Sequence, residues 1–416
     1  MKYVIIGAGS RGMTYGLWAV QHGIEIAAIA EIRPDRLEDA ARKLHVSREM
    51  CFSAPEELFA LGKIADAAII ATMDRDHYGH VMQALDCGYD LLLEKPISPD
   101  ARECIAIEER ANCLGRKITV CHVLRYTSFY SKLKEIVDSG TLGKIVAIKH
   151  AENIGNFHMA HSFVRGNWRN DTLSSPIIMQ KSCHDLDILL WLTGAHCTKV
   201  AAFGSLSYFK ECNAPEGSTD RCLTCPAAKH CRFDAWQAYL PVLGSWPADV
   251  VCLEQTEEAL HQALETGPYG RCVYRCDNNV CDHMSIIMEF DNDVTATFSL
   301  HAQSSAVHRE IQIHCEHGEI WGDDRKGTII VTHFVRNQAE VPVIQEYQTD
   351  DYNKGHGGGD DGIMEDFTVS LSLGSADSRS SISRSVESHL MACAIEESRL
   401  TGNVVYMNEF RNSLKS

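Results

Sequence analysis

The first 31 residues constrain the fold of this chain more narrowly than any other stretch. A short apolar run at 2–6 leads directly into the turn Gly7-Ala8-Gly9-Ser10-Arg11-Gly12, and a helical pattern follows from Met13 to His22. A second apolar run at 24–29 is followed by Glu31. A strand, a glycine turn, a helix, a strand and an acid in this order predict a unit that binds a dinucleotide.

Each part of this unit has a chemical role. The first glycine allows a tight turn, the second lets backbone approach a pyrophosphate, and the third lets helix and strand pack closely. The helix N-terminus presents unpaired N–H groups to the phosphates. A carboxylate about 20 residues after the glycines can accept a hydrogen bond from the adenosine ribose. We therefore expect the cofactor to contact Gly7, Gly9, Ser10, Arg11, Gly12 and Glu31.

The remainder of the first 122 residues alternates strand and helix patterns. The apolar run at 67–71 is typical of a strand buried on both faces, and another strand is expected at 90–93. This alternation predicts an α/β fold with a doubly wound parallel sheet, so we assign residues 1–122 to a Rossmann domain. Such sheets bind ligands at the carboxyl ends of their strands. Further cofactor contacts are therefore expected from Thr72, His77, Glu94 and Lys95.

The pattern changes after residue 122. One long helix is expected from Ile177 to Leu192, and a final helix from Val386 to Leu400. Together with several alternating strand patterns, they predict an α+β domain over 123–416 with a large, mostly antiparallel open sheet. A free sheet face is a natural surface for a second copy of the chain. The expected strands lie at 145–150, 200–209, 284–290, 294–300, 310–315, 318–321 and 328–334.

Composition excludes several classes of partner. A net charge of −17 over 416 residues argues against nucleic acid, because phosphate binding needs a basic face. No stretch reaches the roughly 18 apolar residues of a membrane span, so no membrane partner is expected. The chain enters a strand at once, without an export signal. The 17 cysteines are therefore expected to be mostly reduced thiols in a cytoplasmic protein.

One cluster of cysteines is treated separately. Residues 211–282 form an insert rich in Cys, Pro and Gly, with little periodicity. Cys222, Cys225 and Cys231 have the spacing of a metal-binding knuckle, and a structural zinc would supply folding energy that a small insert lacks. The alternatives are an iron–sulfur cluster or free thiols. We favour Cys272 as the fourth ligand, out of Cys212, Cys272 and Cys276.

Several short motifs resemble those of one known family. Glu94-Lys95-Pro96, Ala71-Thr72 with His77, Arg125-Tyr126 and Leu142-Gly143-Lys144-Ile145 are similar to landmarks of the glucose–fructose oxidoreductase / inositol dehydrogenase / rhizopine catabolism (Gfo/Idh/MocA) family. The resemblance covers nearly the whole chain. It implies an NAD(P)-dependent oxidoreductase that acts on carbohydrate-like molecules and assembles as a homodimer or homotetramer.

The resemblance also implies two catalytic residues. Lys95 would lie between nicotinamide and substrate, where its ammonium can stabilise alkoxide character. The family's helix motif Asp-x-x-x-His-x-x-Asp is matched by Gln180, His184 and Asp187, which share one helical face. His184 is then the candidate general base, and the alternative is a hydrogen-bonded core histidine. Gln180 cannot take a proton, and Lys181 would substitute only in part, because it points about 100° away on an ideal helix.

The remaining candidates are polar or aromatic residues expected to line a substrate pocket. Arginine suits carboxylates, and a tryptophan face can stack on a sugar ring. The alternative for the segment around residues 158–169 is a surface loop with ion pairs. The glycine-rich segment 350–362 is either a connector or an active-site loop. The expected substrate contacts are Arg125, Tyr126, His161, Arg165, Trp168, Gln180, Lys181 and His356.

Three functions remain open from the sequence. The first is an NAD-dependent oxidoreductase acting on a hydroxyl of a sugar, sugar acid or cyclitol. Glu31 favours NAD over NADP, although Arg33 and Arg36 weaken that preference. The second is an NAD-recycling glycosidase or anhydrosugar-converting enzyme, which oxidises a sugar transiently, eliminates, and reduces the product with no net redox change. The third is a non-catalytic dinucleotide sensor.

Overall fold

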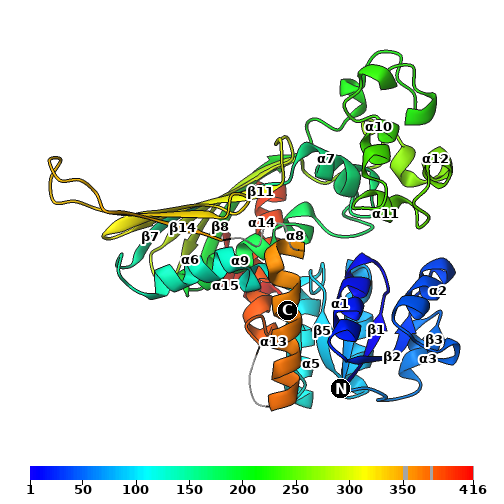
Figure 1. The fold of residues 1–416 in the computed structure, drawn as a ribbon. Coiled ribbons are helices and arrows are strands. Elements are labelled where there is room, and N and C mark those ends of the chain that lie inside the picture. The colour runs from blue at the N-terminus through cyan, green and yellow to red at the C-terminus, as the bar shows by residue number, and fades with distance from the viewer. Residues whose placement is uncertain (350–354, 375–377, 416) are drawn as a thin grey trace.

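A computed structural model describes residues 1–349, 355–374 and 378–415. It contains two sheets (Figure 1). The first has six strands in the order β3-β2-β1-β4-β5-β6, and every neighbouring pair is parallel. Its strands are β1 (Lys2–Ile6), β2 (Glu25–Ala30), β3 (Cys51–Phe52), β4 (Ala67–Ile70), β5 (Asp90–Leu93) and β6 (Ile118–Val120).

Helices flank this sheet on both sides, as the alternating pattern predicts. All four residues of β4 are buried, which is why the strand is apolar along its whole length. Five helices connect the strands: α1 (Ser10–Gln21), α2 (Pro34–Lys43), α3 (Pro55–Phe59), α4 (His77–Asp86) and α5 (Ala101–Leu114). The predicted doubly wound parallel sheet is therefore confirmed.

The second sheet has nine strands in the order β14-β13-β12-β11-β7-β10-β9-β8-β15. All its pairs are antiparallel except β7 with β10, which run parallel. The mostly antiparallel sheet is thus confirmed. Its strands are β7 (Ile145–Asn153), β8 (Cys197–Ser205), β9 (His283–Phe290), β10 (Thr295–His301), β11 (His308–Cys315), β12 (Gly318–Asp323), β13 (Thr328–His333), β14 (Ile344–Gln348) and β15 (Val405–Tyr406).

One face of the second sheet is covered by helices (Figure 1). Among them, α9 (Cys183–Thr193) contacts β7, and α14 (Ile382–Thr401) contacts β8. The opposite face carries exposed apolar side chains, with Phe203 71% and Ile287 60% exposed. Three further helices belong to this part of the chain: α6 (Ser128–Asp138), α13 (Gly359–Leu373) and α15 (Met407–Ser413).

Two sequence expectations about helices were wrong. The helix expected over 177–192 is interrupted: α8 (Ile177–Gln180) ends four residues after it begins, and α9 starts at Cys183. Lys181 and Ser182 lie between the two helices. In addition, part of the segment 350–362 is helical, because α13 begins at Gly359. Residues 350–354 of that segment lie outside the described residues.

The C-terminal helices also pack on the first sheet's domain. Helix α13 contacts α1, and α14 contacts α5. Tyr3 and Phe367 have ring centroids 5.6 Å apart, and the Val120 N–H donates to the Ser380 carbonyl at 2.8 Å. These contacts fix the position of the second domain against the parallel-sheet domain.

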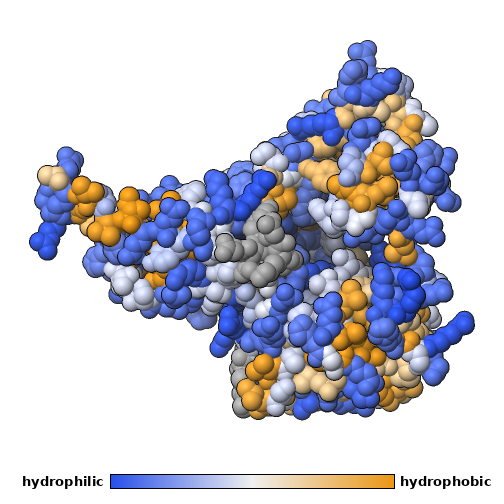
Figure 2. Space-filling model, viewed as in Figure 1, coloured by the Kyte–Doolittle hydropathy of each residue, from blue (hydrophilic) through white to orange (hydrophobic). Residues whose placement is uncertain are grey.

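The insert at 211–282 projects above the parallel-sheet domain (Figure 1). It holds α10 (Ala235–Tyr239), α11 (Ala248–Val251) and α12 (Glu257–Thr266), around a small apolar core that includes Tyr239 and Leu264. The short helix α7 (Asn156–His158) and a π-helical segment at Met159–Arg165 lead toward it. Figure 2 shows the molecule hollowed between the insert and the parallel-sheet domain.

No helix in the described ranges is long and apolar enough to cross a membrane.

Candidate active site

The glycine turn between β1 and α1 has the shape that its sequence requires. Gly7 has a φ of +90°, and a Cβ there would lie 2.6 Å from the Ala71 carbonyl oxygen. A Cβ on Gly12 would lie 2.0 Å from the Gly7 carbonyl oxygen, so neither position accepts a side chain. Gly9 caps α1, and the exposed Ser10 begins the helix. The turn thus offers bare backbone and helix N–H groups, which fits the pyrophosphate of a dinucleotide.

Glu31 lies beside this turn, immediately after β2. One carboxylate oxygen accepts from the Ala8 N–H at 2.8 Å, and the other accepts from the Arg33 N–H at 2.9 Å. The side chain is 7% exposed, so its position is fixed by these bonds. A carboxylate held next to the glycines fits the ribose of an adenosine.

The two predicted cofactor contacts that follow β4 make internal hydrogen bonds. Thr72 Oγ1 lies 3.1 Å from His80 Nδ1. The ring nitrogens of His77 lie 2.7 Å from the Pro96 carbonyl oxygen and 3.2 Å from the Thr72 carbonyl oxygen. His77 is only 1% exposed. Through these two contacts it joins the loops that follow β4 and β5 at the carboxyl edge of the sheet, and it thereby positions Lys95. The structure does not support a direct cofactor contact by His77.

Arg11 and Glu94 belong to a buried network that joins the two domains. Arg11 Nε lies 2.7 Å from Glu94 Oε1, and Arg11 Nη2 lies 2.6 Å from Asp360 Oδ1 in α13. The Tyr15 hydroxyl donates to Glu94 Oε1 at 2.6 Å. Burial alone would raise the pKa of Glu94, but Arg11 and Lys95 outweigh it and the pKa is lowered. The side chain of Arg11 is therefore committed to two carboxylates, and its predicted contact with the cofactor stays a prediction.

His356 lies at the exposed rim of the same network. Its Nδ1 is 2.9 Å from Asp360 Oδ2, and its side chain is 51% exposed. Burial lowers the pKa values of His158 and His184, and the positive charge of a protonated His356 would lower them a little further.

Lys95 reaches from the end of β5 to the second domain. Its Nζ donates to the backbone carbonyl oxygen of Gln180 at 2.7 Å. The ammonium therefore sits at the carboxyl edge of the parallel sheet, where open α/β sheets bind their ligands.

The break between α8 and α9 explains how residue 180 can be a glutamine. The Gln180 amide turns away and donates to Ser174 Oγ at 3.0 Å and to the Ser175 carbonyl. Both serine hydroxyls donate to the buried Asp74, at 2.9 and 2.7 Å. The side chain of Gln180 thus helps join the two domains, and only the backbone carbonyl of Gln180 faces Lys95.

Lys181 instead begins a chain of buried ion pairs. Its Nζ lies 3.2 Å from Glu152 Oε1, and Glu152 Oε2 lies 2.5 Å from Arg309 Nη2. Arg309 Nε and His150 Nε2 each lie 2.7 Å from Asp185 Oδ1. Burial lowers the pKa of Lys181, and Glu152 opposes this shift without cancelling it. A lysine in this setting can release a proton more readily than an exposed lysine.

Three buried histidines stand in a row beside Lys95. The ring centroids of His122 and His184 are 5.6 Å apart, and those of His122 and His389 are 5.5 Å apart. Burial lowers the pKa of His122 to about 4 and that of His389 to about 3. The pKa of His184 lies well below its usual value because of burial and then Lys95. All three imidazoles are thus neutral near pH 7, and within the described residues His184 Nδ1 has no hydrogen-bond partner.

His122 was missed by the sequence analysis, although it follows the last strand of the parallel sheet directly. Its neighbour Asp187, predicted from the helix motif, makes two hydrogen bonds with Arg125, at 2.6 and 2.7 Å. Burial would raise the pKa of Asp187, but Arg125 outweighs it and the pKa is lowered. Arg125 is therefore a partner of the helix motif, and its predicted substrate contact is not supported. The Tyr126 hydroxyl also points elsewhere, since it donates to Asp366 at 2.8 Å.

An aromatic cluster connects the pocket to the insert. His161 Nδ1 lies 3.0 Å from the Tyr239 hydroxyl, and its ring stacks on Tyr269 at 4.7 Å. Trp246, which the sequence analysis did not select, has its ring 5.1 Å from that of His158. Burial lowers the pKa of His158, and Lys181 lowers it further. Trp246 lies beside it and is 47% exposed. Because the insert has no periodic pattern, the sequence does not indicate which way the Trp246 side chain points.

Trp168 and Arg165 lie apart from this pocket. Trp168 is 37% exposed and packs near Phe163, with ring centroids 6.4 Å apart. Arg165 is buried in the insert, where its Nη2 donates to the Phe233 carbonyl at 2.6 Å and to Cys222 Sγ at 3.3 Å. The predicted substrate role of Arg165 is therefore not supported, because its guanidinium is enclosed by the cysteine cluster.

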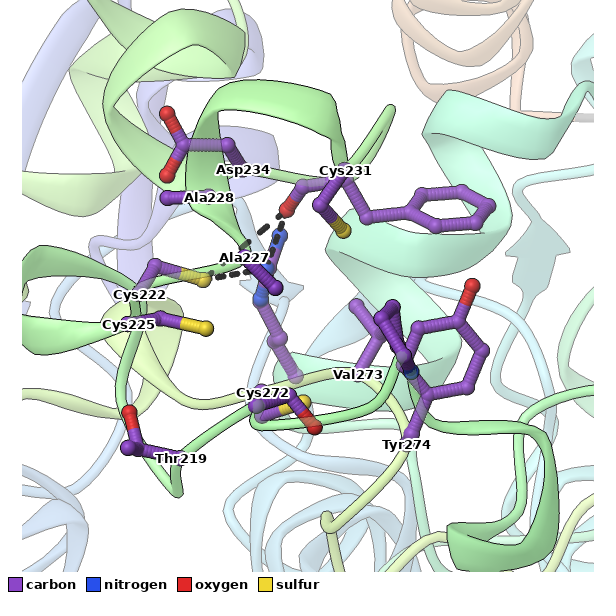
Figure 3. Close-up of a pocket in the computed structure, with 14 residues that line it drawn as sticks. Thr219, Cys222, Cys225, Ala227, Ala228, Cys231, Asp234, Cys272, Val273 and Tyr274 are labelled. Atoms are coloured by element: carbon purple, nitrogen blue, oxygen red, sulfur yellow. Dashed lines mark hydrogen bonds between the residues drawn. The ribbon is translucent and has the colours of Figure 1, made fainter.

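The four cysteines predicted as metal ligands do line one cavity, of about 20 Å³ (Figure 3). Cys272 lines this cavity, whereas Cys212 and Cys276 are not among its lining residues. However, across the described ranges no group of three or more His, Cys, Asp or Glu side chains is arranged to hold a metal ion as it stands. The predicted zinc is thus not shown.

Comparison with known proteins fits this geometry. Residues 1–122 match a family model described as "Oxidoreductase family, NAD-binding Rossmann fold". Residues 134–407 match its companion, "Oxidoreductase family, C-terminal alpha/beta domain". The chain belongs to the Gfo/Idh/MocA oxidoreductase family. It is therefore an NAD-binding oxidoreductase, as the glycine turn and the site at the sheet's carboxyl edge indicate.

Relatives in the Gfo/Idh/MocA family are distant in sequence. YteT of Bacillus subtilis (strain 168), named as an oxidoreductase, is 24% identical over 357 residues, which cover 82% of each chain. An inositol 2-dehydrogenase of Saccharopolyspora erythraea is 28% identical over 193 residues, which cover 45% of this chain and 52% of that protein. The latter match thus spans about half of each protein.

Solved structures share the fold over nearly the whole chain. Levoglucosan dehydrogenase in complex with NADH and levoglucosan has a TM-score of 0.73 at 17% identity, and the match covers 98% of this chain and 99% of that one. Scyllo-inositol dehydrogenase from Lactobacillus casei, with bound NAD(H) and scyllo-inositol, has a TM-score of 0.68 at 18% identity with the same coverage. At these identities the likeness establishes the fold alone.

Proposed function

We propose that this Gfo/Idh/MocA protein is an NAD-dependent dehydrogenase that oxidises a hydroxyl of a sugar, sugar acid or cyclitol. The observation that carries the proposal is the position of the Lys95 ammonium, 2.7 Å from the Gln180 carbonyl oxygen. It stands beside the neutral His184 and the buried Lys181, at the edge of the sheet where the dinucleotide fold places its ligand. Bound NAD would supply the hydride acceptor.

Lys95 would orient and polarise the substrate hydroxyl. Its ammonium has three N–H donors, and the Gln180 carbonyl uses one of them. A second donor can bond the substrate oxygen and stabilise negative charge on it as the C–H bond breaks. Because the acceptor is backbone, the ammonium is held in place before substrate arrives.

His184 would accept the hydroxyl proton. Its depressed pKa keeps the imidazole neutral at pH 7, which is the form that a general base needs. The same shift makes it a weak base, because an imidazole with a low pKa holds a proton poorly. Burial lowers the pKa of Lys181, a second group in the pocket, and as the cation paired with Glu152 it would stabilise negative charge on the substrate oxygen.

The choice of NAD over NADP is supported by Glu31 and Arg33. The carboxylate of Glu31 would repel a 2′-phosphate. Arg33 is already paired with Asp35, with Nε 3.1 Å from Oδ1, so it is not free to compensate. Arg36 lies over the turn, with Nη1 3.6 Å from where a Gly9 Cβ would be, a position suited to the pyrophosphate.

The proposal is tested by a paired assay. The protein is incubated with NAD and separate samples of levoglucosan, inositols, hexoses, hexuronates and chromogenic glycosides, and NADH absorbance and leaving-group release are followed together. NADH formed in proportion to one free substrate supports the proposal. NAD-dependent release of the leaving group without NADH would overturn it in favour of a redox-neutral glycosidase.

A further inference from the structure

The unexplained feature of the insert is a buried arginine among cysteines. Arg165 is 2% exposed, and its guanidinium donates to the carbonyl oxygens of Arg271 and Phe233 and to the sulfur of Cys222. In the described part of the chain no carboxylate lies within ion-pairing distance of it. Burial of an unpaired charge is costly, so negative charge is expected in this cavity.

The backbone around the cavity brings distant cysteines together. Arg221 and Arg271 form an antiparallel bridge, and the Cys272 N–H donates to the Asp220 carbonyl at 2.8 Å. These bonds set Cys272 beside Cys222, although 49 residues separate Arg271 from Cys222. The cavity is therefore lined by cysteines from two segments that are remote in sequence.

The first segment folds as successive tight turns. The Cys225 N–H donates to the Cys222 carbonyl at 3.1 Å, and the Cys231 N–H donates to the Ala228 carbonyl at 3.0 Å. Figure 3 shows the sulfurs of Cys222, Cys225 and Cys231 directed toward the space between them. Turns of this kind place two or three thiols of one short segment around a single point.

We propose that Cys222, Cys225, Cys231 and Cys272 bind one structural zinc ion in the insert. Four thiolates around Zn²⁺ are the composition of a structural tetrahedral site, and they leave the centre with a double negative charge. Arg165 then has its counter-charge, and its N–H group on Cys222 becomes a charge-assisted hydrogen bond to a ligand sulfur. Binding displaces the four thiol protons to solvent.

Without the ion, the thiols line the cavity and are not yet gathered at ligating distance. Cys225 and Cys231 are only partly buried and lie on short turns. The insert has only a small apolar core of its own. A zinc ion would supply folding energy that this core does not.

The test is zinc content, which does not depend on catalytic activity. Full-length protein from zinc-supplemented culture is analysed by mass spectrometry of its metals. We expect about one zinc per chain in the wild type and in the control Cys212→Ser, which changes an exposed cysteine of the insert outside the cavity. We expect Cys225→Ser and Cys272→Ser to lose most of the zinc.

A second measurement covers variants that do not fold. Wild-type protein is titrated with a mercurial reagent while released zinc is followed with a chromogenic chelator. Release that tracks modification of about four thiols supports the site. Absence of zinc after reconstitution with excess Zn²⁺, iron with visible absorbance, or an intact mass two hydrogens lighter from a disulfide would each overturn it.

Discussion

The Lys95 ammonium donates to the carbonyl oxygen of Gln180 across the boundary between the two domains, at 2.7 Å. The acceptor belongs to the backbone, so the position of Lys95 does not depend on which side chain residue 180 carries. The Gln180 amide is bonded to Ser174 on the other side. This arrangement accounts for a glutamine at a position where the resemblance leads one to expect aspartate.

Replacement of Lys95 should separate chemistry from cofactor binding. We expect Lys95→Met to lower kcat about 100-fold or more, because loss of one preorganised donor to a developing oxyanion costs that much. The dissociation constant of NADH, measured by fluorescence titration, should stay within about twofold, because the glycine turn and Glu31 are unchanged. The control is Lys63→Met, whose ammonium bonds the Gly88 carbonyl away from the pocket. Equal losses of NADH binding and activity would show that Lys95 holds the cofactor.

Replacement of Lys181 tests whether this residue, at the break between α8 and α9, contributes to catalysis. We expect Lys181→Met to lower kcat/KM about 10- to 100-fold, because the pocket loses a cation that can stabilise negative charge on the substrate oxygen. The fold should persist, since Glu152 keeps its ion pair with Arg309. Lys199→Met, which removes an exposed pair with Glu289, is the matched control. Unchanged kcat/KM with a marked loss of stability would make Lys181 a structural residue.

Arg125 should matter for stability and not for substrate affinity. Arg125→Met strands the buried Asp187 carboxylate, which should cost about 3–5 kcal/mol in the free energy of unfolding. The double variant Arg125→Met/Asp187→Leu should recover much of that loss, because no charge is left buried. Urea unfolding measures both values. A raised KM with unchanged stability would instead restore the substrate contact that the sequence predicts.

Much of the fold follows from local patterns. The strand at 67–70 and the turn at 7–12 can be predicted from their own residues. The parallel sheet follows from the alternation of strands with helices. The interruption at Lys181 has no such local signal, because the segment from Ile177 is helical in pattern on both sides. It depends on partners elsewhere, namely Glu152 on β7 and Lys95, two residues after the end of β5.

The location of a site residue could be predicted where it depends only on the position of that residue at the end of a strand. Lys95 and Glu31 follow strands whose carboxyl ends meet at one edge, so their location follows from the fold. Arg125 and Arg165 were assigned to the substrate from residue type, which indicates a charge and not its partner. The partner of Arg125 is 62 residues away in sequence, and Arg165 lies 57 residues from the cysteine that it contacts.

The row of neutral histidines should make stability fall in acid. Burial lowers the pKa of His122 from 6.5 to about 4 in the folded state. As the pH falls below 6.5, His122 is protonated in the unfolded chain but not in the folded chain. The free energy of unfolding therefore decreases until the pH reaches about 4. Above 6.5 the contribution is constant. At pH 5 the loss from His122 should be about 2 kcal/mol relative to pH 8, measured by urea unfolding at both values.

His389 adds to this dependence through a specific bond. Its Nε2 accepts from the Ile97 N–H at 2.9 Å, so this nitrogen must be unprotonated in the folded state. Replacing His122 with Leu should therefore reduce the slope between pH 6.5 and 5 without abolishing it, because His389 and His184 still titrate. His230→Gln, at an exposed position in the insert, should leave the slope unchanged. A wild-type protein equally stable at pH 5 and pH 8 would mean that these histidines take up protons as readily in the folded as in the unfolded state, which would contradict their lowered pKa values.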